Sequence, residues 1–487
     1  MTWADQHEGA RRPLAVMKFG GTSVADENCI RRVAAIVADA YAVTDLVVVV
    51  SAMAGITNDL IRAAECAERG EFYRSNEILG SVERRHMVAI EQLCTNDHHQ
   101  SFLVETVHQL VKDGRRWCEI TAASGNLSPC TRDAIASLGE RLSCPLVAAA
   151  LNAVGMPAEA IEGTELIVTD GFHGAAEPLM EQTRERSEAR LRGLLQTGTI
   201  PIVTGFIGAS QHGVLTTLGR GGSDYSATIM AAALAADEVT IWTDVDGIFT
   251  ADPHLVPDAR TIAEVSYSRA AELAHFGAKV LHPKTLCPVQ KSGIPVVVRN
   301  SFNFEAAGTR IVPDDMRADP EAAAMALVHD ATAISVTNRR SRTVGASLRR
   351  SARAADEIRA EVLLLACSPD AVTIVAASGQ AQEIHQQLRR EFSTQPGFEI
   401  RADGDVSVTT LVGEDAERIE RLALEVSDEI ARAGMKLIAM GRSASGHAVS
   451  FVVKRSHFHK VALAIHRRIQ PVACAVACAQ PSTARVQ

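Results

Sequence analysis

The sequence predicts an α/β domain with a mostly parallel sheet between helices, followed by two small ferredoxin-like α+β modules. Near the N-terminus, apolar residues 14–19 precede a stretch with helical periodicity and then the β-branched run "DLVVVV" at 45–50. This β-α-β order is typical of a parallel sheet, and such a run indicates a strand buried on both faces. Beyond residue 330 the order strand–helix–strand–strand–helix occurs twice, as in tandem ferredoxin-like modules.

The remaining elements extend this pattern. Residues 58–95 and 100–120 have helical periodicity, and further strands are predicted at 200–206, 238–244 and 294–300. The alanine-rich stretch 223–236 predicts a helix before the second of these strands. Glycine and prolines within 306–320 indicate a boundary. We therefore expect an N-terminal extension at 1–13, the large α/β domain at 14–310, and modules at 320–402 and 403–487.

Composition excludes several classes of protein. The chain has 487 residues, 47% of them hydrophobic, with a net charge of −9. This charge argues against a nucleic-acid-binding face, and the longest apolar runs fall short of the roughly 20 residues that a membrane helix needs. No signal peptide is predicted. The ten cysteines lack metal-ligand spacing. We interpret them as reduced thiols of a cytoplasmic protein.

The first candidate site is "KFGGTSVAD", at 18–26. The chain has no G-x-x-x-x-G-K-[ST] or G-x-G-x-x-G motif, so phosphate binding would need a different kind of loop. Lys18, followed by Gly20 and Gly21 at a strand end, offers a charge and free backbone N–H groups close to the next helix. The alternative is a lysine that extends to solvent beside a tight turn.

The second candidate site is "TLGRGGSDYSAT", at 217–228, a glycine-rich loop that runs into a helix. Arg220 can bind a carboxylate or phosphate through two parallel hydrogen bonds, and Asp224 follows closely. Ser223 is a candidate N-cap. A structural turn with a surface arginine is the alternative, although glycine on both sides of Arg220 favours close approach of a ligand to the backbone.

Three further stretches contain candidate residues. "WTDVDGIFTADP" at 242–253 places acids at a strand end, where they could bind a metal or simply cap a turn. Ser51 and Thr57 follow a buried strand, at the edge of the sheet where ligands bind in open α/β folds. Glu140 follows Gly139 near a predicted helix, and a solvated helix face is the alternative for it.

Together these stretches resemble one family, the aspartate kinases of the amino-acid-kinase superfamily. The motifs "KFGGTSVAD", "SAMAGITN", "GERLS", "GFIG", "TLGRGGSDYSA", "TDVDGIFTADP" and "FGAKVLHP" occur in the family's order and spacing. The resemblance covers nearly the whole chain, with high specificity in residues 14–300 and less beyond residue 330. Sister kinases for acetylglutamate, carbamate or UMP share the fold without this combination of motifs.

The resemblance implies a role for each candidate residue. Lys18 and Asp224 are the catalytic pair, and Arg220 and Glu140 would bind the α-carboxylate and the ammonium group of L-aspartate. The other residues expected to line the substrate pocket are Ser51, Thr57, Phe206 and Ser223. The residues expected to bind ATP are Lys18, Gly20, Gly21, Thr243, Asp244, Phe249, Lys279 and Val280. Mg²⁺ would accompany the nucleotide, and no protein side chain is assigned to it.

The implied function is phosphorylation of the side-chain carboxylate of aspartate, the first step of aspartate-family amino-acid biosynthesis. Because Lys18, Glu140, Arg220 and Asp224 are all present, the enzyme is favoured over a non-catalytic amino-acid sensor on the same fold. A related kinase for another acidic amino acid is the second alternative. Two positions depart from the family pattern: Phe249, where tyrosine is frequent, and His254, where arginine is frequent.

The C-terminal third resembles the tandem ACT modules of aspartate kinases, which bind end-product amino acids and form dimers. This similarity implies feedback control by lysine or threonine, and a homodimer or homotetramer. "AMGRSASGHAVSFVV", at 439–453, follows the pattern of the second module. The first module departs from the family through the basic run at 339–342. The identity of the effector, or the loss of feedback, therefore stays open.

Overall fold

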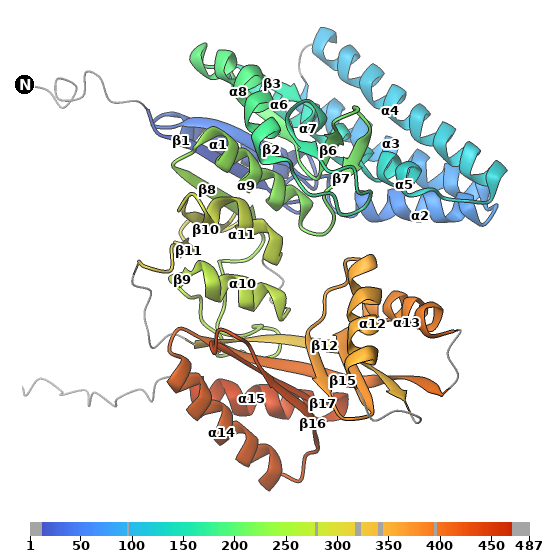
Figure 1. The fold of residues 1–487 in the computed structure, drawn as a ribbon. Coiled ribbons are helices and arrows are strands. Elements are labelled where there is room, and N and C mark those ends of the chain that lie inside the picture. Colours follow the sequence, from blue (N-terminus) through green and yellow to red (C-terminus); the bar gives the residue numbers. More distant parts are fainter. Residues whose placement is uncertain are drawn as a thin grey trace, which may run out of the picture. The chain divides into compact units, whose positions relative to one another are not determined.

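The computed structural model describes residues 12–94, 97–277, 281–316, 323–338, 344–393 and 397–469, in two compact units. The first unit runs to Phe249 and continues from Arg260 to Pro320, and the second contains Thr250–Ala259 and everything from Glu321 onward. Figure 1 shows helices around a sheet in the first unit and strands with helices in the second. The predicted fold class is confirmed.

The first unit contains an eight-stranded sheet with the order β3-β5-β2-β1-β8-β10-β11-β9. All of its pairings are parallel except that of β10 with β11. The strands are β1 (Leu14–Phe19), β2 (Asp45–Val50), β3 (Ala158–Ile161), β5 (Ile200–Thr204), β8 (Glu238–Thr243), β9 (Glu264–Ser266), β10 (Val296–Asn300) and β11 (Thr309–Val312). A small second sheet contains β4 (Val168–Thr169), β6 (Ile207–Ser210) and β7 (Leu215–Thr217). The predicted strands at 14–19, 45–50, 200–206, 238–244 and 294–300 are all present.

Helices pack on both faces of the large sheet (Figure 1). The helices of the first unit are α1 (Glu27–Tyr41), α2 (Ile56–Glu68), α3 (Phe72–Leu93), α4 (Asp97–Ser124), α5 (Pro129–Ala136), α6 (Leu138–Ala153), α7 (Gly163–Leu166), α8 (Met180–Gln196), α9 (Gly222–Leu234), α10 (Tyr267–His275) and α11 (Pro283–Gln290). The predicted helical stretch 58–95 contains two helices, because Gly70 adopts a φ of +78° that ends α2. Residues Pro129–Ala153 are long and apolar enough to span a membrane. However, 78% of the apolar 18-residue stretch within them is buried inside the fold, as in a core helix.

The alternation of side chains along β1 decides where its lysine points. Ala15, Met17 and Phe19 belong to the core formed with α1, α2, α3, α4 and α6. Because successive side chains of a strand point to opposite faces, Lys18 lies on the other face, where α9 packs on β1. Strand β1, which the sequence predicted, therefore also places the charged side chain of Lys18 next to α9.

The second unit is one six-stranded antiparallel sheet with the order β13-β14-β12-β15-β17-β16. The strands are β12 (Ala323–Asn338), β13 (Leu364–Cys367), β14 (Ala371–Ala377), β15 (Phe398–Gly413), β16 (Leu437–Arg442) and β17 (Ala448–Lys454). The helices are α12 (Val344–Glu357), α13 (Ser378–Phe392), α14 (Ala416–Arg432) and α15 (Phe458–Ile469), with a short 3₁₀ turn at Arg455–His457. The two long central strands pair along most of their length, with register shifts between Val328 and Ala333.

The doubled strand–helix–strand–strand–helix order is present, but both halves share one sheet. The expected module boundary at 402/403 falls inside β15, so the division into two modules remains a prediction. The segment Thr250–Ala259 completes this unit. The Met325 amide donates to the Thr250 carbonyl at 2.8 Å, and Ala251 and Val256 join the core of Phe451 and Ile465.

The turn that follows β8 is fixed by Thr309, at the start of β11. The Thr309 hydroxyl accepts a hydrogen bond from the Ile248 amide at 2.8 Å and donates to the Ile262 carbonyl at 2.6 Å. A Cβ at Gly247 would lie 2.5 Å from this hydroxyl, so only glycine fits there. One buried hydroxyl therefore ties the turn to two other segments.

We expect Thr309→Val to lower the free energy of unfolding of the first unit by about 1–3 kcal/mol, because the nearly isosteric valine leaves a buried N–H and a buried C=O unpaired. Urea denaturation followed through Trp242 fluorescence would measure this loss. Thr309→Ser, which keeps the hydroxyl, is the matched control. Equal stability of the valine and serine variants would contradict the assignment.

Candidate active site

The site is centred on an ion pair between β1 and α9. Lys18 Nζ lies 2.5 Å from Asp224 Oδ1, and the two side chains are only 9% and 14% exposed. Asp224 lies in the first turn of α9, which begins at Gly222 just after the glycine-rich loop. The ion pair contradicts the alternative in which Lys18 extends to solvent. It brings together two predicted residues that are 206 positions apart (224 − 18).

The two glycines after Lys18 are needed for close backbone packing. A Cβ at Gly21 would lie 2.9 Å from the Ala52 carbonyl oxygen, so any larger residue would displace the strand-end loop of β2. The Gly20 amide donates to the Trp242 carbonyl at 3.0 Å, which ties this loop to the end of β8. The loop leads into α1, whose N-cap Asp26 accepts a hydrogen bond from the Cys29 amide at 2.9 Å.

A cavity of about 220 Å³ opens beside the ion pair. Its lining includes seven of the eight predicted catalytic and substrate-binding residues: Lys18, Ser51, Thr57, Glu140, Phe206, Ser223 and Asp224. The eighth, Arg220, is exposed and has no hydrogen bond or ion pair to a described residue, but its neighbours Gly219 and Gly221 both line the cavity. Residues from five separate parts of the sequence thus converge on one small space.

Glu140 is the least solvated acid of the cavity. It lies in the first turn of α6 and is 3% exposed, and its Oε2 atom has no hydrogen-bond partner. The backbone comes this close because Gly139 has no side chain: a Cβ there would lie 2.6 Å from that of Ala52. Burial raises the pKa of Glu140 to about 8. The alternative of a solvated helix face is therefore wrong.

Phe206 has an uncommon backbone conformation. Its φ is +71°, in the left-handed region that favours glycine. Hydrogen bonds hold it there, since its amide donates to the Ser226 hydroxyl at 2.9 Å and its carbonyl accepts from the Leu218 amide at 2.9 Å. A Cβ at Gly222 would meet the Phe206 ring at 2.5 Å. Such a conformation is retained where the surroundings fix it, often at a functional site.

The predicted nucleotide turn begins where β8 ends, next to β1. Thr243 is partly buried and Asp244 is exposed, and their side chains lie 3.3 Å apart. Phe249, also partly buried, pairs with Thr261 in an isolated β-bridge. Lys279 and Val280 lie outside the described residues. His254 lies in the segment of the second unit, where its amide donates to Asp252 at 2.9 Å.

Sequence reasoning missed the residues that support this turn. Asp246 accepts hydrogen bonds from the side-chain amides of Asn300 at 2.7 Å and Asn303 at 3.1 Å. The Ser301 amide donates to the Thr243 carbonyl at 2.8 Å, and its hydroxyl lies 2.8 Å from that of Ser23. The signal was present in "RNSFN", a mostly polar stretch at 299–303 that covers the end of β10 and the residues after it. In the described ranges, no group of three or more His, Cys, Asp or Glu residues could hold a metal ion.

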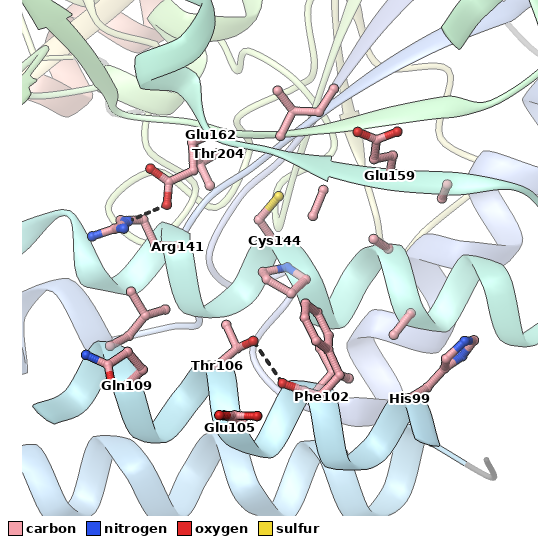
Figure 2. A pocket seen from close by; sticks show the side chains of 18 of the residues that line it. His99, Phe102, Glu105, Thr106, Gln109, Arg141, Cys144, Glu159, Glu162 and Thr204 are labelled. Atoms are coloured by element: carbon pink, nitrogen blue, oxygen red, sulfur yellow. Dashed lines mark hydrogen bonds and ion pairs between the residues drawn. The ribbon is translucent and has the colours of Figure 1, made fainter. Parts of the chain in front are cut away.

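A larger groove of about 780 Å³ lies elsewhere in the first unit, between α4, α6 and β3 (Figure 2). Arg141 is the one arginine or lysine among the described residues that line it, and it pairs with Glu162 at 2.7 Å. The other charged lining residues include Glu105, Asp113 and Glu159. This groove is therefore a poor environment for phosphates, whereas the smaller cavity has Lys18 and a glycine-rich loop.

Three comparisons with known proteins agree on one family. The family model described as the amino acid kinase family matches residues 13–300. Lysine-sensitive aspartokinase 3 of Escherichia coli (strain K12) is 33% identical over 463 residues, which are 94% of this chain and 99% of that protein. The chain spans about half the length of some plant relatives, such as the chloroplastic bifunctional aspartokinase/homoserine dehydrogenase 2 of Arabidopsis thaliana, 30% identical over 93% of this chain.

Solved structures give the same result. The structure of E. coli aspartokinase III with aspartate and ADP in the R-state aligns with a TM-score of 0.82 at 31% identity, covering 93% of this chain and 99% of that one. The structure of E. coli aspartokinase III with lysine and aspartate in the T-state aligns with a TM-score of 0.75 at 30% identity, covering 94% of this chain and 100% of that one.

Proposed function

The chain belongs to the aspartokinases of the amino acid kinase family, and we propose that it transfers the γ-phosphoryl group of ATP to the side-chain carboxylate of L-aspartate. The products are 4-phospho-L-aspartate and ADP. The observation that supports this assignment most directly is the cavity in which Lys18, Asp224 and Glu140 meet beside the glycine-rich loop. The assignment rests on that geometry together with the family.

The reaction needs charge neutralisation more than proton transfer. An aspartate side chain has a pKa of about 3.9, so at neutral pH it is ionised and needs no general base. An oxygen of this carboxylate forms a bond to the γ-phosphorus while the bond from that phosphorus to the ADP oxygen breaks. Both reactants are anions. The protein must therefore supply positive charge where they meet.

Lys18 is the residue placed to supply this charge. Its ammonium group lies in the cavity wall, and Gly20 and Gly21 begin the loop directly after β1. Asp224 holds the ammonium in position at 2.5 Å. An orienting role for Asp224 follows, because the acceptor carboxylate has no proton to remove. Lys18 would then contact the transferred phosphoryl group.

The amino-acid end of the substrate would be bound by charges of opposite sign. Glu140, buried and with a free oxygen, would accept the ammonium group, and the Arg220 guanidinium would bind the α-carboxylate. Ser51, Thr57, Phe206 and Ser223 line the space between them. This pairing favours a free α-amino acid over an N-acylated one, because an amide nitrogen would leave the buried Glu140 without a cation.

ATP would lie along Gly20–Gly21 and the turn from Thr243 to Phe249, with Lys279 and Val280 nearby by family resemblance. Mg²⁺ bound to the phosphates would neutralise part of their charge. The described residues fit this arrangement, since the cavity has only the two carboxylates of Asp224 and Glu140, and the described residues contain no group of three or more ligands that would bind the ion without the nucleotide.

We further propose that the second unit binds an amino-acid effector, with lysine favoured over threonine. The support is the E. coli relative described as lysine-sensitive and its structure with lysine. Assembly as a dimer or tetramer through this unit is part of the same proposal. A cytoplasmic location fits the eight cysteines of the described segments, which are all free thiols.

The substrate is tested by trapping the acyl phosphate with hydroxylamine in the presence of ATP and Mg²⁺. We expect hydroxamate with aspartate and none with glutamate or N-acetylglutamate. Hydroxamate with another acid in preference to aspartate would establish the related-kinase alternative. Calorimetric binding of aspartate without any hydroxamate would establish the sensor alternative.

Repeating the assay with millimolar lysine or threonine tests the effector, and rates unchanged by both would contradict the regulatory proposal.

Lys18→Ala should reduce kcat by about a hundredfold to a thousandfold, because one preorganised charge at the transferred phosphoryl group is lost. The hydroxylamine assay measures this change, and circular dichroism checks the fold. The matched control is Lys454→Ala, which removes another lysine paired with an aspartate, at 3.0 Å from Asp403 in the second unit. Near-normal kcat for Lys18→Ala would remove this residue from catalysis.

Glu140 should make aspartate binding pH-dependent. Its pKa of about 8 keeps it neutral at pH 7, whereas the ammonium group of aspartate requires the carboxylate. The KM for aspartate should therefore fall as pH rises from 6.5 to 8.5, by up to about tenfold per pH unit below the pKa. Binding near pH 7 should also release a proton, measurable by calorimetry in buffers of different ionisation enthalpy.

Glu140→Gln is the control for this prediction. The amide cannot ionise, so the variant should have a high KM for aspartate that no longer falls across this range, with no proton release. A wild-type KM that stays constant between pH 6.5 and 8.5 would show that the free acid does not govern binding.

A further inference from the structure

Within the described part of the chain, no side-chain bond fixes Arg220. Its guanidinium is exposed and has no hydrogen bond or ion pair to a described residue. The neighbouring Gly219 and Gly221 both adopt positive φ angles, of +81° and +65°. A glycine on each side leaves this backbone unusually free to move. Whether the guanidinium reaches a ligand in the cavity therefore depends on what holds the loop at its ends.

The entry of the loop is held by Asp133, an acid of α5 that none of the predicted motifs contains. Asp133 is 3% exposed. Its Oδ1 atom accepts a hydrogen bond from the Thr217 hydroxyl at 2.6 Å. Its Oδ2 atom accepts from the Thr217 amide at 3.1 Å, from the Gly174 amide at 3.1 Å and from His173 Nδ1 at 2.8 Å. One buried carboxylate thus receives four hydrogen bonds, two of them from the residue three positions before Arg220.

The same carboxylate fixes a second segment against the loop. The segment Gly171–Ala176 lies between Asp133 and the loop: the Ala176 amide donates to the Thr217 carbonyl at 3.0 Å. A Cβ at Gly219 would lie 2.9 Å from the Gly174 carbonyl oxygen, so the two backbones are in close contact. Asp133 therefore determines both the position of Thr217 and the surface on which Gly219 rests.

The exit of the loop is held separately. The Tyr225 hydroxyl donates to Glu177 Oε2 at 2.9 Å, and Lys284 Nζ lies 2.7 Å from Glu177 Oε1. Tyr225 is in α9, where the ion pair of Asp224 with Lys18 adds a further restraint. A change at Asp133 should thus displace the start of the loop, which includes Arg220, more than its end, which includes Asp224.

We infer that Asp133 is a positioning residue for Arg220 and thereby sets the affinity of the enzyme for aspartate. The inference rests on the proposed function, in which Arg220 binds the α-carboxylate. One buried carboxylate accepts from four donors, the two of Thr217 buried and those of His173 and Gly174 part-buried, and so fixes Thr217 and Gly174 and with them the Cα position of Arg220. ATP, bound at the other side of the site along β1 and β8, does not depend on this loop.

The test compares variants of the full-length enzyme by steady-state kinetics. Asp133→Ala removes all four acceptor contacts and should raise the KM for aspartate by about tenfold or more, while the KM for ATP stays within about twofold. Asp133→Asn should restore most of the affinity. Its amide oxygen can keep the three donors at the Oδ2 position, and its NH₂ group can donate to the Thr217 hydroxyl.

A matched control separates positioning from general destabilisation. Glu83 is another part-buried carboxylate that binds a histidine and an arginine, with His108 at 2.7 Å and Arg115 at 2.6 Å, on helices α3 and α4 away from the loop. Glu83→Ala should lower the thermal midpoint, as Asp133→Ala does, and leave both KM values unchanged. A purely structural role for Asp133 would make the two variants behave alike.

A second pair of variants keeps the inference testable if Asp133→Ala does not fold. Thr217→Val removes only the hydroxyl donor and should raise the KM for aspartate by about threefold, while Thr217→Ser should leave it unchanged. The inference would be overturned if whichever of Asp133→Ala and Thr217→Val folds had a KM for aspartate within twofold of the wild-type value. Equal rises in the KM values for aspartate and ATP would also overturn it. Failure of the proposed function looks different, because the wild-type enzyme would then form no aspartyl hydroxamate.

Discussion

The site depends on the ion pair between Lys18 and Asp224. Two anions, a carboxylate and a triphosphate, must approach each other, and their repulsion is strong wherever water is excluded. A buried charge without a partner is costly, and an ion pair offsets that cost. Asp224, at 2.5 Å, holds the Lys18 ammonium group in a place where only 9% of the lysine side chain is exposed. The rest of the site is built around this fixed cation.

Charge of the opposite sign completes the arrangement. Glu140 is buried with a raised pKa and an unpaired oxygen, so a cation beside it would favour its ionised form. Arg220 is exposed and lies between two glycines. In the proposed function, Glu140 would bind the ammonium group and Arg220 the α-carboxylate, so that together they would select an amino acid with both of these groups free.

The second unit connects to the nucleotide turn through the chain itself. Residues Asp244–Phe249 follow β8 in the first unit, and the next ten residues, Thr250–Ala259, pack in the core of the second before the chain returns at Arg260. The turn is thus continuous with a segment whose contacts lie in the proposed effector-binding unit. Thr309 and Asn300 fix the turn on the side of the first unit. A covalent route between the two units therefore begins at the residues proposed to bind ATP.

The sequence by itself determined the strands, the glycine-rich loops, the family and most of the cavity. Stretches such as 46–50 are fully apolar, and Gly21 and Gly139 stand where neighbouring segments pack too closely for a side chain, so local chemistry was sufficient for these features. Only the tertiary structure revealed Asp133, Asn300 and the shared sheet of the second unit. Asp133 stands in an ordinary helix, and its role arises from donors 40 to 84 positions away that the fold brings to it. Patterns along a chain record periodicity and turns, whereas hydrogen bonds between distant segments exist only after those segments have packed.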